Sequence, residues 1–318
     1  MVTSAYHEPV LLAETLGLLD LNPGSVIIDG TLGGAGHAHE ILSQTEPDGL
    51  LLGLDLDAEA LLEASERLAE FGSRARLIRS SFRRLDDIAA ELGPTPIDGI
   101  VLDLGVSSHQ LDAPERGFRF GAEQTDSPLD MRLDGEGDRE PAAALLAHKS
   151  AEELERLFSE YGQLPGSRRL ARAIVARRSS APFETASDLV GLIRELGIGR
   201  GRKHNPATLV FQALRIAVND ELGALEEGLA AAIRVLRPGG RLAVIAYHSL
   251  EDRLVKHTFR SAARGCTCPP EWPACACGNL PTLDILTRRP IVPDADEIER
   301  NPRARSARLR AAARLEAA

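Results

Sequence analysis

The chain is poor in aromatic and sulfur-containing residues and has no long apolar run. Aromatic residues make up 4% of its 318 residues, and it has four cysteines, two methionines and one tryptophan. A membrane-spanning helix needs about 20 consecutive apolar residues. The sequence has no such run, so we expect no membrane partner. The first nine residues lack the basic and apolar segments of a secretory signal. These absences predict a cytoplasmic protein.

Charge is unevenly distributed along the chain. The net charge of −10 argues against a general affinity for nucleic acids. Arginine and lysine nevertheless gather in two segments, 165–207 and 300–314, and the second contains no acid among its arginines. Such clusters indicate either surfaces that meet phosphate at chosen places or solvated helix faces. From the residues alone, both interpretations stay open.

A glycine-rich segment is the most informative feature that is present. The apolar run Val26–Asp29 leads into glycines at 30, 33, 34 and 36, and a second apolar run ends at Asp55. This order is typical of a nucleotide-binding βαβ unit, in which glycines let the backbone approach a ligand and the acid accepts ribose hydroxyls. The spacing is not G-x-G-x-x-G, which makes a pyrophosphate ligand less suitable. S-adenosylmethionine, which has an adenosine end and no phosphate, fits better.

The chain alternates strand and helix at both ends and is helical in its middle. We expect strands at Val26–Asp29, Leu50–Asp55, Arg76–Arg79 and Ile97–Leu104, with helices between them, and a parallel sheet with right-handed crossovers. Residues 111–205 have no convincing strand. A long helix around Thr208–Leu236, a Pro-Gly-Gly turn and a strand at Arg241–Tyr247 then resume the alternation.

This order predicts an α/β fold in which a helical domain is inserted into a Rossmann-like sheet. A helix followed by a Pro-Gly-Gly turn and a late strand is common in methyltransferase sheets of this type. The domains are then 1–110, the first part of a methyltransferase domain; 111–205, an inserted substrate-recognition domain; and 206–318, the second part with a basic C-terminal tail. Ligands of such sheets bind at the carboxyl ends of the strands, where Asp29, Gly34, Gly36, Asp55 and Asp103 fall.

Several longer motifs resemble one known family. They are Tyr6-His-Glu-Pro-Val-Leu-Leu, Asp29-Gly-Thr-Leu-Gly-Gly-Ala-Gly-His, Asp103-Leu-Gly-Val-Ser-Ser-His-Gln-Leu-Asp, Pro128-Leu-Asp-Met-Arg, Phe211-Gln-Ala-Leu-Arg-Ile-Ala-Val-Asn-Asp-Glu-Leu, Tyr247-His-Ser-Leu-Glu-Asp-Arg and Asn301-Pro-Arg-Ala-Arg-Ser. The chain is similar to the bacterial small-subunit ribosomal RNA cytosine-N4-methyltransferases, the MraW-type enzymes. The resemblance implies methyl transfer from S-adenosylmethionine to the exocyclic N4 of cytidine 1402 in 16S rRNA, within the small ribosomal subunit.

The resemblance also implies a set of cofactor contacts. Backbone amides of the glycine-rich loop meet the methionine carboxylate, Asp55 binds the ribose hydroxyls, and Phe82 packs on the adenine. Asp103 holds the methionine ammonium or faces the reacting amine. The implied contact residues are Gly34, Ala35, Gly36, His37, Asp55, Phe82, Asp103 and Gln110. The chain departs from the family at His109, where proline is usual, next to the expected position of Gln110.

The chemistry of the acceptor limits the catalytic groups. The N4 lone pair of cytosine is delocalised into the ring, so an enzyme must align the amine and accept a hydrogen bond from it as positive charge develops. Amino-methyltransferases place such acceptors after the fourth strand. Asp103 is therefore the first catalytic candidate, followed by Ser107, Ser108 and His248. A loop cap is the alternative for Asp103, and a hydrogen-bonded structural role is the alternative for His248.

Two groups of residues in the inserted domain are candidates for contacting RNA. Arg168, Arg169 and Arg172 follow one another at helical spacing and are expected to meet phosphates. Phe118 and Phe120 lie in a glycine-containing loop, where aromatic rings either stack on a base taken out of its stack or pack locally.

The four cysteines are Cys266, Cys268, Cys275 and Cys277. Disulfides are rare in a cytoplasmic protein, and four neighbouring thiols can bind a tetrahedral structural zinc. The C-x-C spacing departs from the usual C-x₂-C of zinc knuckles, so four reduced thiols in a surface loop are the alternative.

Two other functions stay open from the residues alone. One is a DNA or small-molecule amino-methyltransferase, although DNA enzymes usually have a Pro-Pro-aromatic motif after the fourth strand, which Asp103-Leu-Gly-Val lacks. The other is a non-catalytic RNA-binding assembly factor. The complete set of Gly34, Gly36, Asp55 and Asp103 argues against lost cofactor binding.

Overall fold

The computed structural model describes residues 9–106, 110–111, 113–120, 127–135, 137, 139–199, 205–266, 268–269, 271–274 and 276–316. The chain forms two compact units. The first contains Met1–Gly105 and Leu222–Ala318, and the second contains Val106–Glu221. In the part of the chain that is described, no helix combines the length and the apolar character needed to cross a membrane.

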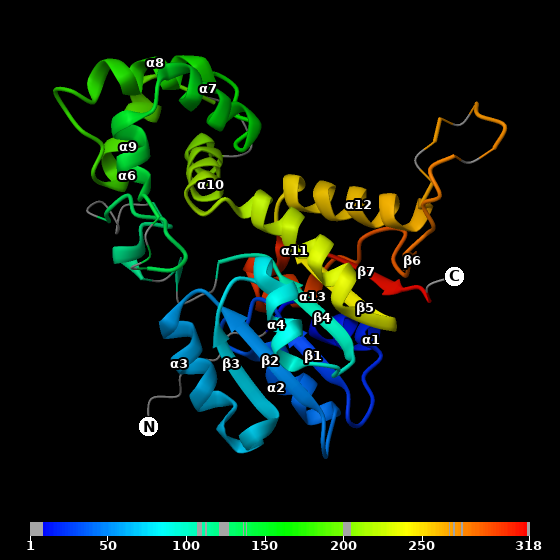
Figure 1. The fold of residues 1–318 in the computed structure, drawn as a ribbon. Helices are drawn as coiled ribbons and strands as arrows, with labels where there is room; N and C mark the ends of the chain where they lie inside the picture. The colour runs from blue at the N-terminus through cyan, green and yellow to red at the C-terminus, as the bar shows by residue number, and fades with distance from the viewer. Residues whose placement is uncertain are drawn as a thin grey trace. The chain divides into compact units, whose positions relative to one another are not determined.

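The first unit is built on a seven-stranded sheet of order β3-β2-β1-β4-β5-β7-β6 (Figure 1). The strands are β1 (Val26–Asp29), β2 (Leu50–Asp55), β3 (Ala75–Arg79), β4 (Ile97–Asp103), β5 (Leu236–Ala246), β6 (Leu283–Ile285) and β7 (Arg308–Arg314). The strands β1 to β5 are parallel, and β7 runs antiparallel to both β5 and β6. This is the Rossmann-like arrangement that the sequence predicts, and its strand order reverses at β1, where open sheets of this kind bind ligands.

Helices cover both faces of this sheet. One face packs against α1 (Leu12–Leu19), α2 (Gly36–Gln44) and α3 (Ala58–Arg67), and the other packs against α4 (Leu85–Leu92), α11 (Glu221–Val235) and α12 (Ser249–Arg264). Successive strand residues point to opposite faces. Accordingly, Ile27 lies in the first core and Ile28 in the second. Because both faces are covered, the central strands β1 and β2 are apolar up to the acid that ends each of them.

Shorter helices complete this unit. They are the 3-10 helices η1 (Ala69–Arg74), η2 (Phe82–Arg84) and η4 (Pro302–Ser306), and the α-helix α13 (Ala295–Arg300). The segment predicted as a basic tail is largely strand: β7 pairs with β5, and Arg310 is buried there with its Nε 2.6 Å from Oδ1 of Asp252. Pairing to the sheet and this ion pair, rather than contact with phosphate, account for that arginine.

The second unit is helical. It contains the 3-10 helix η3 (Pro114–Arg116) and the helices α6 (Ala142–His148), α7 (Ala151–Glu160), α8 (Ser167–Arg177), α9 (Ala186–Glu195) and α10 (Pro206–Asn219). Leu146, Phe158, Leu170, Leu189 and Leu214 bring one residue from each α-helix into a common core. The Ser150–Glu153 and Thr185–Asp188 capping boxes define where α7 and α9 begin.

The single helix predicted for Thr208–Leu236 is wrong. The chain forms α10 and α11 instead, because Asp220 adopts a left-handed conformation with φ of 49° that ends α10. Val210 and Leu214 of α10 are buried in the core of the second unit. The two units therefore divide at Gly105 and Glu221, whereas the sequence placed the boundaries at 110 and 205.

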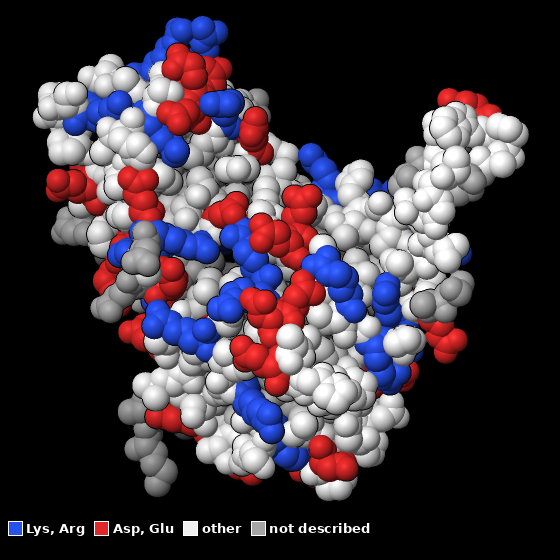
Figure 2. All heavy atoms as spheres, viewed as in Figure 1, with Lys and Arg blue, Asp and Glu red and all other residues white. Residues whose placement is uncertain are grey.

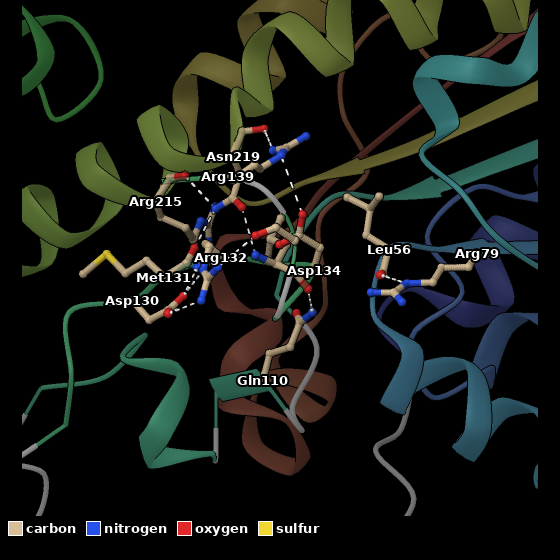
Figure 3. A network of polar contacts seen from close by, with 12 residues as sticks. Leu56, Arg79, Gln110, Asp130, Met131, Arg132, Asp134, Arg139, Arg215 and Asn219 are labelled. Atoms are coloured by element: carbon tan, nitrogen blue, oxygen red, sulfur yellow. Dashed lines mark hydrogen bonds and ion pairs between the residues drawn. The ribbon is translucent and has the colours of Figure 1, made fainter. Parts of the chain in front are cut away.

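Asn219, the last residue of α10, ties this helix to the loop that precedes α6 (Figure 3). Its Oδ1 accepts a hydrogen bond from the Leu133 amide at 2.9 Å, and its Nδ2 donates to the Met131 carbonyl at 2.7 Å and to the Arg215 carbonyl at 2.9 Å. The Arg139 guanidinium donates to the Asn219 carbonyl. With 2% of its surface exposed, Asn219 uses its whole amide on main-chain partners.

Replacing Asn219 by alanine should destabilise the second unit by about 2 to 4 kcal/mol, because buried main-chain groups lose their partners. Urea unfolding followed by circular dichroism, together with hydrogen exchange of the α10 amides, measures this loss. Asn22→Ala is the control, since Asn22 is exposed and its Nδ2 makes one hydrogen bond, to the Asp20 carbonyl. Equal stability of the two variants would contradict the prediction.

Candidate functional site

Three carboxylates end three adjacent strands of the first unit. Asp29 is the last residue of β1, Asp55 of β2 and Asp103 of β4. Because these strands are parallel, their carboxyl ends meet at one edge of the sheet, and the negative charges of Asp103 and Asp55 both act on Asp29. These carboxyl ends lie beside the point between β1 and β4 at which the strand order reverses, and open sheets of this kind bind ligands there.

The loop after β1 is held against this edge by its own backbone. The Gly33 amide donates to Oδ2 of Asp55 at 2.9 Å, and Gly33 and Ala35 both have positive φ, 47° and 56°. A Cβ on Gly30 would lie 2.4 Å from the Leu102 side chain, so only glycine fits there. The loop therefore keeps its backbone close to the strand ends.

The helix α2 begins at Gly36, and the residue before it, Ala35, makes no capping hydrogen bond through its side chain. The Gly34 carbonyl is held by Arg67, whose Nη1 donates to it at 2.8 Å. The first amides of a helix lack acceptors within the helix and carry partial positive charge. The Ala35 amide donates to the Leu32 carbonyl at 2.8 Å, so the amides of Gly34, Gly36 and His37 are the ones that suit a carboxylate. The predicted contacts of these four residues with a cofactor stay predictions.

Asp55 is fixed by two main-chain amides. Its Oδ2 accepts from Gly33 and its Oδ1 accepts from Asp57 at 2.9 Å. Burial raises the pKa of this carboxyl, while the two hydrogen bonds act in the opposite direction. Each carboxylate oxygen retains a lone pair, so the side chain can still accept hydrogen bonds from two hydroxyl groups.

Asp103 is held from two sides. Its amide donates to the Thr31 hydroxyl at 2.6 Å, and its Oδ1 accepts from the Tyr247 hydroxyl at 2.8 Å. Burial and the neighbouring Asp103 charge raise the pKa of Tyr247 well above its ordinary value, so this tyrosine stays a proton donor. The Asp103 side chain is 24% exposed, with Oδ2 lying 3.9 Å from Nδ1 of His37.

Burial favours the neutral form of His37. Its ring is 6% exposed, and burial lowers its pKa. Nε2 lies 3.1 Å from the Val10 carbonyl, which can only accept, so Nε2 carries the proton and Nδ1 faces Asp103 with its lone pair. His37 therefore adds no positive charge beside the Asp103 carboxylate.

His248 begins α12 as its N-cap. Its Nδ1 accepts from the Glu251 amide at 3.3 Å, and its own amide donates to the Glu251 carboxylate at 3.1 Å, which together form a capping box. Nε2 lies 3.1 Å from the other oxygen of Glu251. The structure thus gives His248 the structural contacts that the sequence left open as an alternative, and its substrate contact stays a prediction.

Asp29 is a third acid of this site, which the sequence places at the carboxyl end of β1 without giving it a specific role. It is 2% exposed, its Oδ1 accepts from the Thr31 amide at 3.1 Å, and burial together with the charges of Asp103 and Asp55 raises its pKa to about 7. Its place as the last residue of β1 was the available signal. A carboxyl that titrates near neutral pH beside two other acids is typical of a functional site.

The raised pKa of Asp29 predicts a stability that depends on pH. The unfolded side chain ionises near its ordinary value of 3.8 and the folded one near 7, so between these values the folded state binds more protons. The free energy of unfolding should therefore fall as the pH rises from about 4 to about 7, by at most about 1.4 kcal/mol per unit.

Asp29→Asn should flatten this decline, because the amide does not titrate. Urea unfolding at a series of pH values measures it, with the exposed acid Asp87→Asn as control. A wild-type slope that persists in Asp29→Asn would assign the decline to another group.

Phe82 and Gln110, which are also predicted to contact the cofactor, each have contacts within the protein. Phe82 begins η2, and its ring packs against Gly228 of α11. The contact is so close that a Cβ on Gly228 would lie 2.4 Å from the ring. Gln110 belongs to the second unit, is buried, and donates from Nε2 to the Leu133 carbonyl at 3.2 Å. Their contacts with a cofactor stay predictions. The catalytic candidates Ser107 and Ser108 lie outside the described residues.

The arginines expected to meet RNA lie on α8. Arg168, Arg169 and Arg172 are exposed, while Leu170 and Ile174 face the core of the second unit. Figure 2 shows basic side chains over this part of the molecule, with acidic side chains next to them. Arg168 forms an ion pair with one of these acids, because its Nε lies 3.9 Å from Oε2 of Glu155. The surface is therefore locally basic on an acidic protein.

The two phenylalanines considered for base stacking pack locally. Phe118 and Phe120 lie against the core of the second unit, and the rings of Phe120 and Phe211 are 4.6 Å apart between centroids. Packing accounts for both side chains.

Three of the four cysteines come together. Cys266, Cys268 and Cys277 have their sulfur atoms within 4.8 Å of one another in the connection between α12 and β6. The fourth predicted ligand, Cys275, lies outside the described residues.

Comparison with known proteins gives consistent matches. The sequence model of the MraW methylase family matches residues 4–315. A protein of Geobacter sulfurreducens named ribosomal RNA small subunit methyltransferase H is 53% identical over 312 residues, which are 97% of this chain and 99% of that protein. Proteins of the same name from Geotalea daltonii and Symbiobacterium thermophilum are 51% identical over 312 residues and 50% identical over 315 residues. They cover 97% and 98% of this chain and 98% of their own length. The likeness therefore extends through both compact units.

Proposed function

The chain belongs to the MraW methylase family, and from that premise we propose that it methylates the exocyclic N4 of cytidine 1402 in 16S rRNA, with S-adenosylmethionine as methyl donor. The relatives that match over their whole length are named as methyltransferases of small-subunit ribosomal RNA. The observation that carries the proposal is the meeting of Asp29, Asp55 and Asp103 beside a glycine-rich loop, at the edge where the strand order reverses.

The residues at this edge fit S-adenosylmethionine. The amides of Gly34, Gly36 and His37 at the start of α2 suit its carboxylate, Asp55 suits its two ribose hydroxyls, and the Asp103 carboxylate suits its ammonium. When bound, S-adenosylmethionine supplies a methyl group that is activated by the adjacent sulfonium. Methyl transfer therefore requires no covalent help from the protein, and the protein's task is binding and alignment.

Asp103 is also the best placed group to receive the acceptor amine. As the amine is methylated, positive charge develops on N4 and a proton must leave it. A carboxylate that accepts an N4–H hydrogen bond stabilises that charge. The Tyr247 hydroxyl occupies Oδ1 of Asp103 and fixes its orientation, which leaves Oδ2 on the side of His37. Ser107, Ser108 and His248 are the further candidates for contacting the base.

The second unit is proposed to recognise RNA through α8. Its exposed arginines offer charge to phosphates without requiring a basic protein overall. The partner is 16S rRNA within the small ribosomal subunit, and the place of action is the cytoplasm.

A methylation assay tests the proposal directly. Small ribosomal subunits that lack the modification are incubated with labelled S-adenosylmethionine, the RNA is digested to nucleosides, and the label is identified by chromatography. We expect N4-methylcytidine, mapped to position 1402 by protection with complementary oligonucleotides. Cofactor binding with no label in RNA would favour a DNA or small-molecule acceptor. Absence of cofactor binding would favour a non-catalytic assembly factor.

A further inference from the structure

The connection between α12 and β6 forms a closed loop that the proposed methyl transfer does not use (orange in Figure 1). Its two ends are joined by the Thr282 amide, which donates to the Ala262 carbonyl at 2.8 Å. Gly265 has φ of 67°, and a Cβ there would lie 2.4 Å from the Leu280 backbone. The chain thus doubles back tightly at the base of the loop, and this brings Cys266 near Cys277.

The sulfur atoms in this loop have the spacing of metal ligands. Sγ of Cys266 lies 3.8 Å from Sγ of Cys277, and with Sγ of Cys268 they form a group within 4.8 Å. A tetrahedral zinc with Zn–S bonds of about 2.3 Å separates neighbouring sulfurs by about 3.8 Å. A disulfide would require about 2.05 Å. The distance therefore excludes a disulfide. It matches two ligands of one ion, and in the absence of an ion it also matches a hydrogen bond from the Cys277 thiol to the Cys266 sulfur.

Two features of the loop bear on its sulfur atoms. The Ala276 amide donates to Sγ of Cys268 at 3.3 Å, which orients that sulfur. His257, Arg260 and Arg264 line a hollow of about 290 Å³ together with Cys266.

We propose that Cys266, Cys268 and Cys277 bind one structural Zn²⁺. Thiolates select zinc over magnesium or calcium, which prefer oxygen ligands. Three sulfur atoms within 4.8 Å of one another are close enough to bind one ion, which would hold the loop closed. Cys275, the fourth ligand that the sequence predicts, lies outside the described residues.

Metal analysis of the full chain tests the proposal. The protein is purified under reducing conditions without chelator, and its metals are measured by mass spectrometry. We expect about one zinc per chain, and at least a tenfold lower zinc content in each of Cys266→Ser, Cys268→Ser and Cys277→Ser. Leu280→Ala is the control, because this exposed side chain is in the same loop and should leave zinc unchanged.

The tryptophan in the loop gives a second readout. Trp272 is the single tryptophan of the chain and lies between Cys268 and Cys277, with 54% of its surface exposed. Removing zinc with a chelator should lower its fluorescence anisotropy, and added ZnCl₂ should restore it. The three serine variants should show the low value throughout while keeping the circular dichroism of the folded protein.

Three results would overturn the proposal. The first is a native protein that contains no metal and in which all four thiols react with a thiol reagent. The second is a protein without metal whose cysteines are oxidised. The third is a protein that contains iron in place of zinc. None of them depends on methyltransferase activity, so failure of this proposal is distinguishable from failure of the proposed function.

Discussion

Replacing Asp103 by asparagine should lower the rate of methyl transfer to small ribosomal subunits by at least about a hundredfold. The amide oxygen can still accept the hydrogen bond from Tyr247, so the local structure is preserved. What is lost is the negative charge that would stabilise the acceptor amine as it is methylated. The measurement is single-turnover methylation at saturating cofactor, which isolates the chemical step.

The two roles proposed for Asp103 give different kinetic signatures. If its carboxylate faces the acceptor amine, kcat falls and the Kd of S-adenosylmethionine changes little. If it holds the ammonium, the Kd rises by about tenfold or more, since a charge-assisted hydrogen bond is lost. Calorimetric titration of the cofactor separates the two. Tyr247→Phe should have a smaller effect than Asp103→Asn, because it removes only the hydroxyl that orients the carboxylate.

The matched control for Asp103 is on the same strand. Asp98 lies in β4 near its start, and its carboxylate accepts from the Val26 amide at 2.7 Å. Asp98→Asn therefore changes an acid of the same sheet away from the carboxyl edge, and turnover per folded molecule should be unchanged. If Asp103→Asn retains both turnover and cofactor affinity, the site must lie elsewhere.

The strands that position the site could be predicted because their signals are local. Val26–Asp29 and Leu50–Asp55 are short apolar runs, each ending in an acid, and the alternation with helices requires a parallel sheet. Strand β7 carries no such signal. Its sequence is Arg308-Leu-Arg-Ala-Ala-Ala-Arg, and its burial depends on pairing with β5 and on the Arg310–Asp252 contact, 58 residues apart in the chain.

The site was predictable in position but not in its electrostatics. That Asp55 and Asp103 share one edge follows from the parallel strands alone. The raised pKa of Asp29 and the bond from Tyr247 to Asp103 depend on burial and on a contact across 144 residues. The break between α10 and α11 did have a local signal, because Asp220 follows an asparagine and aspartate tolerates the left-handed conformation.

Reversing the charge of Arg169 and Arg172 together should weaken binding to unmodified small subunits by at least about tenfold. Both side chains are exposed on α8, opposite the buried Leu170 and Ile174, so the substitutions leave the core of the second unit intact. Each phosphate contact releases counterions, and the slope of log K against log salt changes by about 0.7 to 0.9 per contact. Losing two contacts should reduce that slope by about 1.4 to 1.8.

Filter binding over a salt series, at fixed pH and saturating S-adenosylmethionine, measures both quantities. The charge-matched control is Arg288→Glu with Arg289→Glu, two exposed arginines of the first unit. If this control weakens binding as much as the α8 pair does, the effect belongs to net charge and not to a surface. If the α8 variant keeps the wild-type slope, its arginines do not meet phosphate. A selective loss on α8, with cofactor affinity unchanged, would assign RNA recognition to the helical unit and methyl transfer to the sheet.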